Sequence, residues 1–145
     1  MLTVLDSGTY YHHATIHGDR YRNLFDHILY LPEVVPADFA DSRVILVADR
    51  QHPALLRRIA PLLLDHLARG RMLVVMGENE AQDWLPRVSW QPRPTNFWWW
   101  LEPGARPEHR LDAPDHPLFR HISLEDTVWH YHGVMTPPPG ARSLV

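Results

Sequence analysis

Reactive side chains follow three short apolar runs of the sequence, at the points where buried strands are expected to end. They are Asp6, His12 and His13 after the first run, Asp49 and Arg50 after the second, and Glu78 and Asn79 after the third. An imidazole beside carboxylates can move protons, so the catalytic candidates are Glu78, His12 and His13. Carboxylate, guanidinium and amide groups hydrogen-bond small polar molecules, so the ligand-binding candidates are Asp6, Asp49, Arg50 and Asn79. The alternative is that these residues only terminate strands as loop formers.

Histidines give the sequence a second chemical possibility, a metal site. His130 and His132 form an H-x-H pair, and on a strand both side chains point to one face. Neutral imidazoles at this spacing bind zinc or a similar ion. Further ligands would come from His12, His13, His17 or His116. Because an H-x-H pair also arises by chance in a chain with eleven histidines, the first expectation is a protein without a cofactor.

Four consecutive aromatic residues, Phe97 to Trp100, form the strongest aromatic cluster of the chain. On a strand, Trp98 and Trp100 would face one side, with Phe97 and Trp99 on the other. One side is then expected to join the core, while the other covers a loop or a contact between subunits of a homo-oligomer. The alternative is that exposed indole rings stack on sugar rings.

The elements that position the reactive residues are continuous apolar, β-branched runs, which are typical of strands buried on both faces. The runs span residues 2–5, 43–48 and 72–76. A brief further strand is expected at residues 33–35. Strands that alternate with helices predict a mainly parallel sheet, whose loops after each strand emerge at one edge. We therefore expect Asp6, His12 or His13, and Glu78 to lie around one cleft at this edge.

Two helices are expected between these strands. The first spans about residues 20–30, with Asp19 as its N-cap and an apolar stripe that Pro32 ends. The second is a leucine-rich segment whose core face is formed by Leu55, Leu56, Ile59, Leu62, Leu63 and Leu67. Because proline suits a helix start better than its interior, Pro61 is expected to divide it, with a main helix over about 61–69. Gly70 is expected at the left-handed position after the helix.

The sequence changes in character after residue 80, where prolines become frequent. Short strands are expected at residues 84–91, 96–101 and 128–135, and residues 102–117 are polar and rich in turn formers. Residues 143–145 have the pattern of a further strand that the end of the chain cuts off.

Composition limits the classes of function. The chain has 145 residues, 45% of them hydrophobic, which excludes wholesale disorder. A net charge of −3 provides no basic field for nucleic acid or an anionic membrane. Cysteine and lysine are absent, which excludes thiolate nucleophiles, thiolate zinc sites and Schiff-base lysines. With no export signal and no apolar run of membrane-spanning length, a cytoplasmic location is expected.

The strand Arg43–Ala48, the helix that ends at Arg69-Gly70 and the strand Met72–Gly77 resemble the middle of class I glutamine amidotransferase-like domains, in particular the trehalose-utilisation (ThuA-like) group. The resemblance covers about residues 1–80 and implies a flavodoxin-like sheet. The family's nucleophilic cysteine follows the last of these strands, where this chain reads Gly77-Glu78-Asn79, so glutaminase activity is not expected. The resemblance offers His130 and His132 as stand-ins for the family's histidine–acid pair. Since the family's domains are longer, the chain is expected to be truncated after Val145.

These observations together predict a single α/β domain over residues 1–145, flavodoxin-like, with an irregular, strand- and proline-rich C-terminal part. The expected function is that of an amidotransferase-like domain without glutaminase activity that binds a small polar ligand such as a sugar, or that serves as a structural module. One alternative is a metal-assisted hydrolase or isomerase with histidine ligands and Glu78 as general base. Another is a protein-interaction domain that uses Trp98–Trp100.

Overall fold

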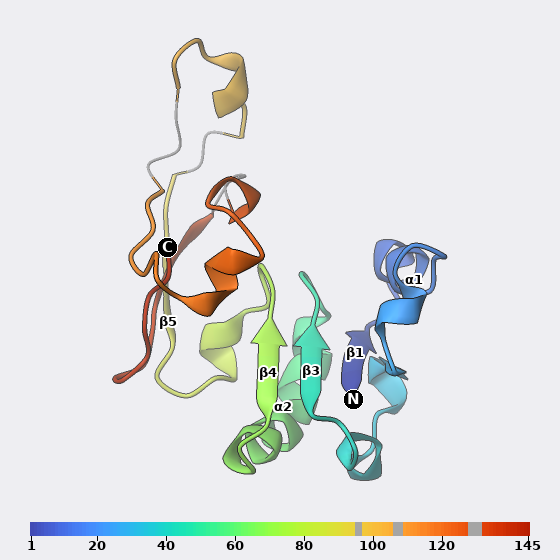
Figure 1. Cartoon of the computed structure of the whole chain (residues 1–145). Helices are drawn as coiled ribbons and strands as arrows, with labels where there is room; N and C mark the ends of the chain where they lie inside the picture. The colour runs from blue at the N-terminus through green and yellow to red at the C-terminus, as the bar shows by residue number, and fades with distance from the viewer. Residues whose placement is uncertain (95–96, 106–108, 128–131) are drawn as a thin grey trace. The chain divides into compact units, whose positions relative to one another are not determined.

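The computed structural model describes residues 1–94, 97–105, 109–127 and 132–145, and these residues form two compact units. The first unit is Met1–Leu85 and the second is Pro86–Val145, so the boundary lies close to the change in sequence character (Figure 1). The single domain expected over residues 1–145 stays a prediction, which independent unfolding of the two units would contradict. Within the described residues, no helix combines the length and apolar character needed to cross a membrane.

The first unit is built on a four-stranded parallel sheet, which confirms the α/β class and the mainly parallel sheet. Its strands are β1 (Leu2–Asp6), β2 (His27–Tyr30), β3 (Val44–Val47) and β4 (Met72–Val75). They lie side by side in the order β2-β1-β3-β4. The three apolar runs of the sequence therefore form adjacent strands, and all their C-terminal loops lie at the same edge of the sheet.

One face of the sheet is covered by the long helix α2 (Pro53–Ala68), as Figure 1 shows. Alternate residues of β3, Ile45 and Val47, are fully buried beneath Leu56, Ile59 and Leu63 of the helix. The burial of these apolar side chains is the main stabilising contribution to the unit, because each Å² of apolar surface removed from water contributes about 25 cal/mol.

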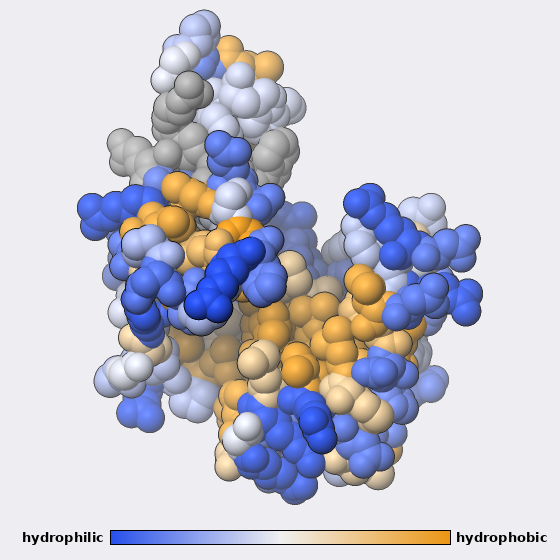
Figure 2. All heavy atoms as spheres, in the orientation of Figure 1, coloured by the Kyte–Doolittle hydropathy of each residue, from blue (hydrophilic) through white to orange (hydrophobic). Residues whose placement is uncertain are grey.

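The other face of β4 remains apolar and exposed, which differs from the expectation that this run is buried on both faces. Leu73 and Val75 pack against the core, while Met72 is 58% exposed and Val74 is 37% exposed. Figure 2 shows hydrophobic residues gathered over the β3–β4 part of this face. β4 is also the last strand of its sheet, so its outer edge has no partner strand among the described residues.

The expected helix over residues 20–30 and the expected strand at 33–35 are wrong. The helix is α1 (Tyr10–Ile16), residues 27–30 form β2, and Leu31–Glu33 is a 3₁₀ turn. The apolar residues of this segment fit a helical stripe and a strand almost equally well. Parallel pairing of all four β2 residues with β1 decides for the strand, a tertiary contact that local sequence does not reveal.

Helix α2 is continuous, so the predicted division at Pro61 is wrong. Proline removes one helical hydrogen bond, but its ring lies on the exposed side of the helix, while the buried residues on either side hold the helix against the sheet. The core face of α2 also differs from the prediction near the C-terminal end of the helix, because Leu67 is exposed. His66 is buried there, and its Nε2 is bonded to the Met72 carbonyl at 3.0 Å. Gly70 adopts a φ of 73°, as expected for the residue that ends a helix.

The second unit contains a two-stranded antiparallel sheet of β5 (Ser89–Pro92) and β6 (Gly133–Thr136). β5 confirms only the end of the strand predicted at 84–91, because Trp84 belongs to a buried turn. Residues 99–101 form a 3₁₀ turn, so the strand predicted at 96–101 is wrong where the chain is described. Of residues 128–135, the first four lie outside the described residues. No strand forms at residues 143–145, where the Leu144 carbonyl accepts a hydrogen bond from the Asp112 amide at 2.9 Å.

Candidate functional site

The loops that follow β3 and β4 are bonded to each other. The Asp49 carboxylate accepts a hydrogen bond from the Glu78 amide at 2.6 Å, and the Glu78 carbonyl accepts one from the Arg50 amide at 3.0 Å. Gly77, with a φ of 61°, provides the turn that brings these groups together. A Cβ atom at this position would overlap the Asp49 carboxylate, so the close approach requires glycine.

Asn79 holds the same two loops from the inside. Its side chain is fully buried, where Oδ1 accepts a hydrogen bond from the Gln51 amide and Nδ2 donates to the Ala48 and Met76 carbonyls. These bonds occupy the amide group on both sides. Asn79, taken from the sequence as a ligand-binding candidate, therefore has the geometry of a residue that positions the loops.

His12 connects the loop after β1 to the loop after β3. Its Nε2 lies 2.6 Å from the Asp49 carbonyl, which can only accept, so Nε2 carries the proton. The single lone pair of Nδ1 is then shared by the hydroxyls of Thr9 at 2.8 Å and Ser7 at 3.0 Å. Both nitrogens of the buried ring are thus engaged with atoms of these loops, a geometry that suits a positioning residue, and the catalytic role suggested by the sequence stays a prediction.

A second histidine cluster stands beside His12, at the end of β1. Asp6 is buried, and its Oδ2 lies 3.0 Å from Nε2 of His17 and 3.6 Å from Nδ1 of His13. Its Oδ1 accepts a hydrogen bond from the Gly8 amide at 2.8 Å, which fixes the orientation of the carboxylate. The predicted proximity of Asp6 and His13 is thus present, and His17 joins them.

Arg50 and Glu78 form the solvent-facing part of the edge. The Arg50 Nε lies 3.2 Å from Glu78 Oε2 and 3.8 Å from Asp49 Oδ2, and all three side chains are substantially exposed. Exposed ion pairs of this kind contribute little to stability, about 0–1 kcal/mol. Their donor and acceptor atoms are accessible to a ligand in a way that those of His12 and Asn79 are not.

The histidines and tryptophans predicted in the second half of the chain are only partly described. His130 lies outside the described residues, and the His132 ring contacts Phe97 edge-on at 5.0 Å. The Trp98 and Trp100 rings lie 5.6 Å apart, and Trp98 is 65% exposed. These tryptophans lie on a turn and not on a strand, so the predicted placement of Trp98 and Trp100 on one face and Trp99 on the other is wrong. The rings of Trp99 and Trp100 pack edge-to-face.

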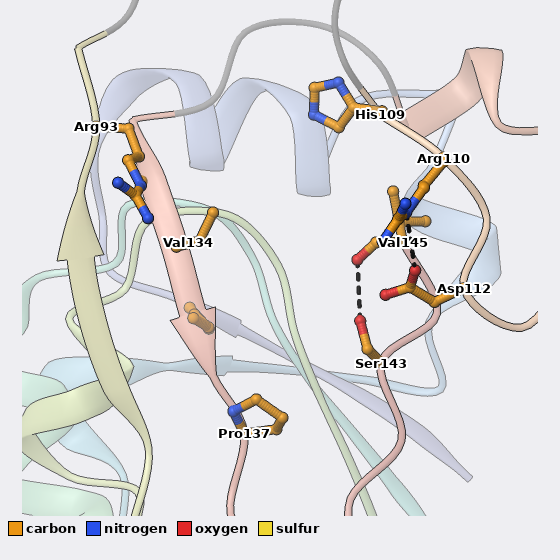
Figure 3. A pocket seen from close by; sticks show the side chains of 10 residues that line it. Arg93, His109, Arg110, Asp112, Val134, Pro137, Ser143 and Val145 are labelled. Carbon is orange, nitrogen blue, oxygen red and sulfur yellow. Dashed lines mark hydrogen bonds and ion pairs between the residues drawn. The ribbon is translucent and has the colours of Figure 1, made fainter.

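The second unit also holds a pocket of about 550 Å³ that the sequence did not predict. Figure 3 shows Arg93, His109 and Arg110 around it, with the C-terminal segment at one side. Arg110 pairs with Asp112 at 3.5 Å, and the Ser143 hydroxyl donates to the Val145 carbonyl at 3.0 Å. The pocket is assembled from four separate segments of an irregular region, which leaves no local sequence pattern to identify it.

Comparisons with protein-family models, with curated proteins and with solved structures found no match for this chain.

Proposed function

We propose that the chain is an amidotransferase-like α/β module of flavodoxin-like topology that binds a small polar ligand, such as a sugar, and has no glutaminase activity. The observation that carries this proposal is the joining of three loops, after β1, β3 and β4, by hydrogen bonds at the carboxyl edge of the sheet. Such a network keeps exposed polar side chains in fixed positions, which reduces the entropy lost when a ligand binds.

The strand order supports the choice of this edge. The order β2-β1-β3-β4 corresponds to the first four strands of the flavodoxin-like order 2-1-3-4-5. In open sheets of this kind, ligands bind outside the carboxyl ends of the strands, where the direction of the strand order changes. Here that point lies between β1 and β3, whose loops His12 connects.

The chemistry of the exposed side chains supports a polar ligand. Asp49 and Glu78 offer carboxylate acceptors and Arg50 offers guanidinium donors, a combination that hydrogen-bonds hydroxyl groups from both sides. Glutamine hydrolysis by the family's route needs a thiolate, and the sequence contains no cysteine. A cysteine-free chain also suits a reducing compartment, and we propose a cytoplasmic location on that basis.

Amide chemical shifts of the isotope-labelled full chain, titrated with trehalose and with glucose, test the proposal. We expect saturable shifts in residues 49–51 and 77–79 for at least one sugar. Glu78→Gln removes the charge while keeping the shape, and should weaken binding at least tenfold with an unchanged melting temperature. Asp65→Asn is the matched control, because Asp65 is also an exposed, ion-paired carboxylate but lies near the C-terminal end of α2.

Two results would refute small-ligand binding at this edge. One is the absence of saturable shifts with either sugar. The other is binding that Glu78→Gln and Asp65→Asn leave equally strong.

A further inference from the structure

The end of β1 and the end of α1 bring three metal-ligating side chains together. One ligand atom each from Asp6, His13 and His17 lies within 4.8 Å of the other two. His13 and His17 are one helical turn apart, joined by the hydrogen bond from the His17 amide to the His13 carbonyl at 3.0 Å. Their rings stack at 4.3 Å with an angle of 33° between the planes, so both project on the same side of the helix.

We propose that Asp6, His13 and His17 bind one divalent transition-metal ion of the zinc class. Two imidazole nitrogens and a carboxylate oxygen are a donor set that favours zinc, cobalt or nickel over magnesium and calcium, which prefer oxygen ligands alone. With three protein ligands, a tetrahedral ion keeps one position for water or for a ligand oxygen. The proposal does not depend on sugar binding at Glu78.

Burial divides the three ligands into a fixed one and two adjustable ones. The Asp6 side chain is 4% exposed and is oriented by the Gly8 amide, whereas the side chains of His13 and His17 are 66% and 41% exposed. Ligand atoms around a tetrahedral zinc ion, at bond lengths of about 2.0–2.1 Å, lie roughly 3.3 Å apart. Rotation of the exposed imidazoles can bring their nitrogens from within 4.8 Å to this separation, while the Asp6 carboxylate stays in place.

A metal ion would also compensate the negative charge of the Asp6 carboxylate. A carboxylate that is almost removed from water depends on the partners it contacts, which among the described residues are the Gly8 amide and the two imidazoles. Neutral imidazoles are the form that binds metal, and a cation placed between them and the carboxylate supplies the compensating charge. The proposal assigns the histidine-ligand site to Asp6, His13 and His17. His130, of the predicted pair His130 and His132, lies outside the described residues, so that pair stays a prediction.

The test uses the full chain without an affinity tag, stripped of metal by chelator and titrated with Co²⁺ and then with Zn²⁺. We expect one Co²⁺ per chain, with visible absorption typical of a nitrogen- and oxygen-ligated ion, and displacement by Zn²⁺. His13→Gln and His17→Gln should each lower the affinity more than about 100-fold, since even outer-shell partners of a metal contribute 10–100-fold. His121→Gln, at an exposed histidine of the other unit, is the control and should bind as the unaltered chain does.

Asp6→Asn is less suitable, because Asp6 is buried and its change could unfold the protein, whereas the two exposed histidines avoid this difficulty. The proposal is overturned if the double variant His13→Gln/His17→Gln binds Co²⁺ as tightly as the unaltered chain. It is equally overturned if binding is lost only on His132→Gln, or if the unaltered chain binds no metal. Since sugar binding is read from Glu78→Gln and metal binding from the histidine variants, each proposal can fail alone.

Discussion

Gly77→Ala tests whether the turn after β4 must be glycine to hold the loops together. Two costs add at this position. An alanine at a φ of 61° carries the strain of the left-handed region, about 1–2 kcal/mol. Its Cβ would also lie 2.6 Å from Cγ and 2.9 Å from Cβ of Asp49, which must move away. The hydrogen bond from the Glu78 amide to the Asp49 carboxylate is then lost, at about 1–2 kcal/mol for an exposed, charge-assisted bond.

Gly70→Ala is the matched control for this experiment. Gly70 has a similar φ of 73°, but nothing lies within 4 Å of a Cβ atom built on it. It therefore carries the strain without the overlap. We expect Gly77→Ala to lower the free energy of unfolding by about 2–4 kcal/mol and Gly70→Ala by about 1–2 kcal/mol.

Urea denaturation followed by circular dichroism at 222 nm measures both losses, because the 16-residue α2 gives most of this signal. Equal losses in the two variants would refute the reasoning, since the contact with Asp49 would then contribute nothing. A Gly77→Ala loss below that of Gly70→Ala would refute it in the same way.

Three further outcomes are expected. Pro61→Ala should raise the free energy of unfolding by about 2 kcal/mol, because alanine is better than proline inside a helix by about 3 and the looser unfolded chain returns about 1; a lower melting temperature would contradict this. Incubation with glutamine should release no ammonia, because the thiolate is missing, and release above the rate without protein would contradict it. The backbone amide of Ser123 and then its hydroxyl bond to Asp126 and hold the pKa of that carboxyl below its ordinary value of 3.8. This contribution to stability is present above the ordinary pKa and is lost as pH falls through the lower, folded pKa, and carboxyl NMR titration should show the pKa rising in Ser123→Ala.

The sequence predicts a strand of the sheet correctly where the apolar residues of that strand identify it without knowledge of its neighbours. Residues 44–48 and 72–76 are unbroken apolar runs bounded by Arg43 and Asp49 and by Arg71 and Gly77, and their short length and β-branched residues favour strands. The helix expected over residues 20–30 is wrong because its apolar stripe ends in the continuous apolar run 28–31, which suits a buried strand as well as a helix. Only the pairing of β2 with β1, between residues about 24 positions apart, separates the two.

The candidate site was predictable as a region and less so as a set of roles. Strand ends in a parallel sheet share an edge, which brings Asp6, Asp49 and Glu78 to the same side of the molecule. The bonds of His12, a catalytic candidate, and of Asn79, a ligand-binding candidate, could not be predicted, because they depend on which backbone atoms of distant loops face these side chains. The pairing of His13 with His17 requires a helix over residues 10–16, and the sequence assigned the first helix elsewhere.

The outer edge of β4, which has no partner strand in the part of the chain that the structure describes, affects how the protein behaves at high concentration. A strand at the end of a sheet presents unpaired amide and carbonyl groups to any other chain that approaches it. Proteins commonly protect such edges with lysine or proline, whereas β4 reads Met-Leu-Val-Val and its exposed side chains are apolar. Self-association by strand addition at this edge is therefore a hazard in concentrated solution. A charged side chain in place of Met72 is the smallest change that would reduce it without touching the core.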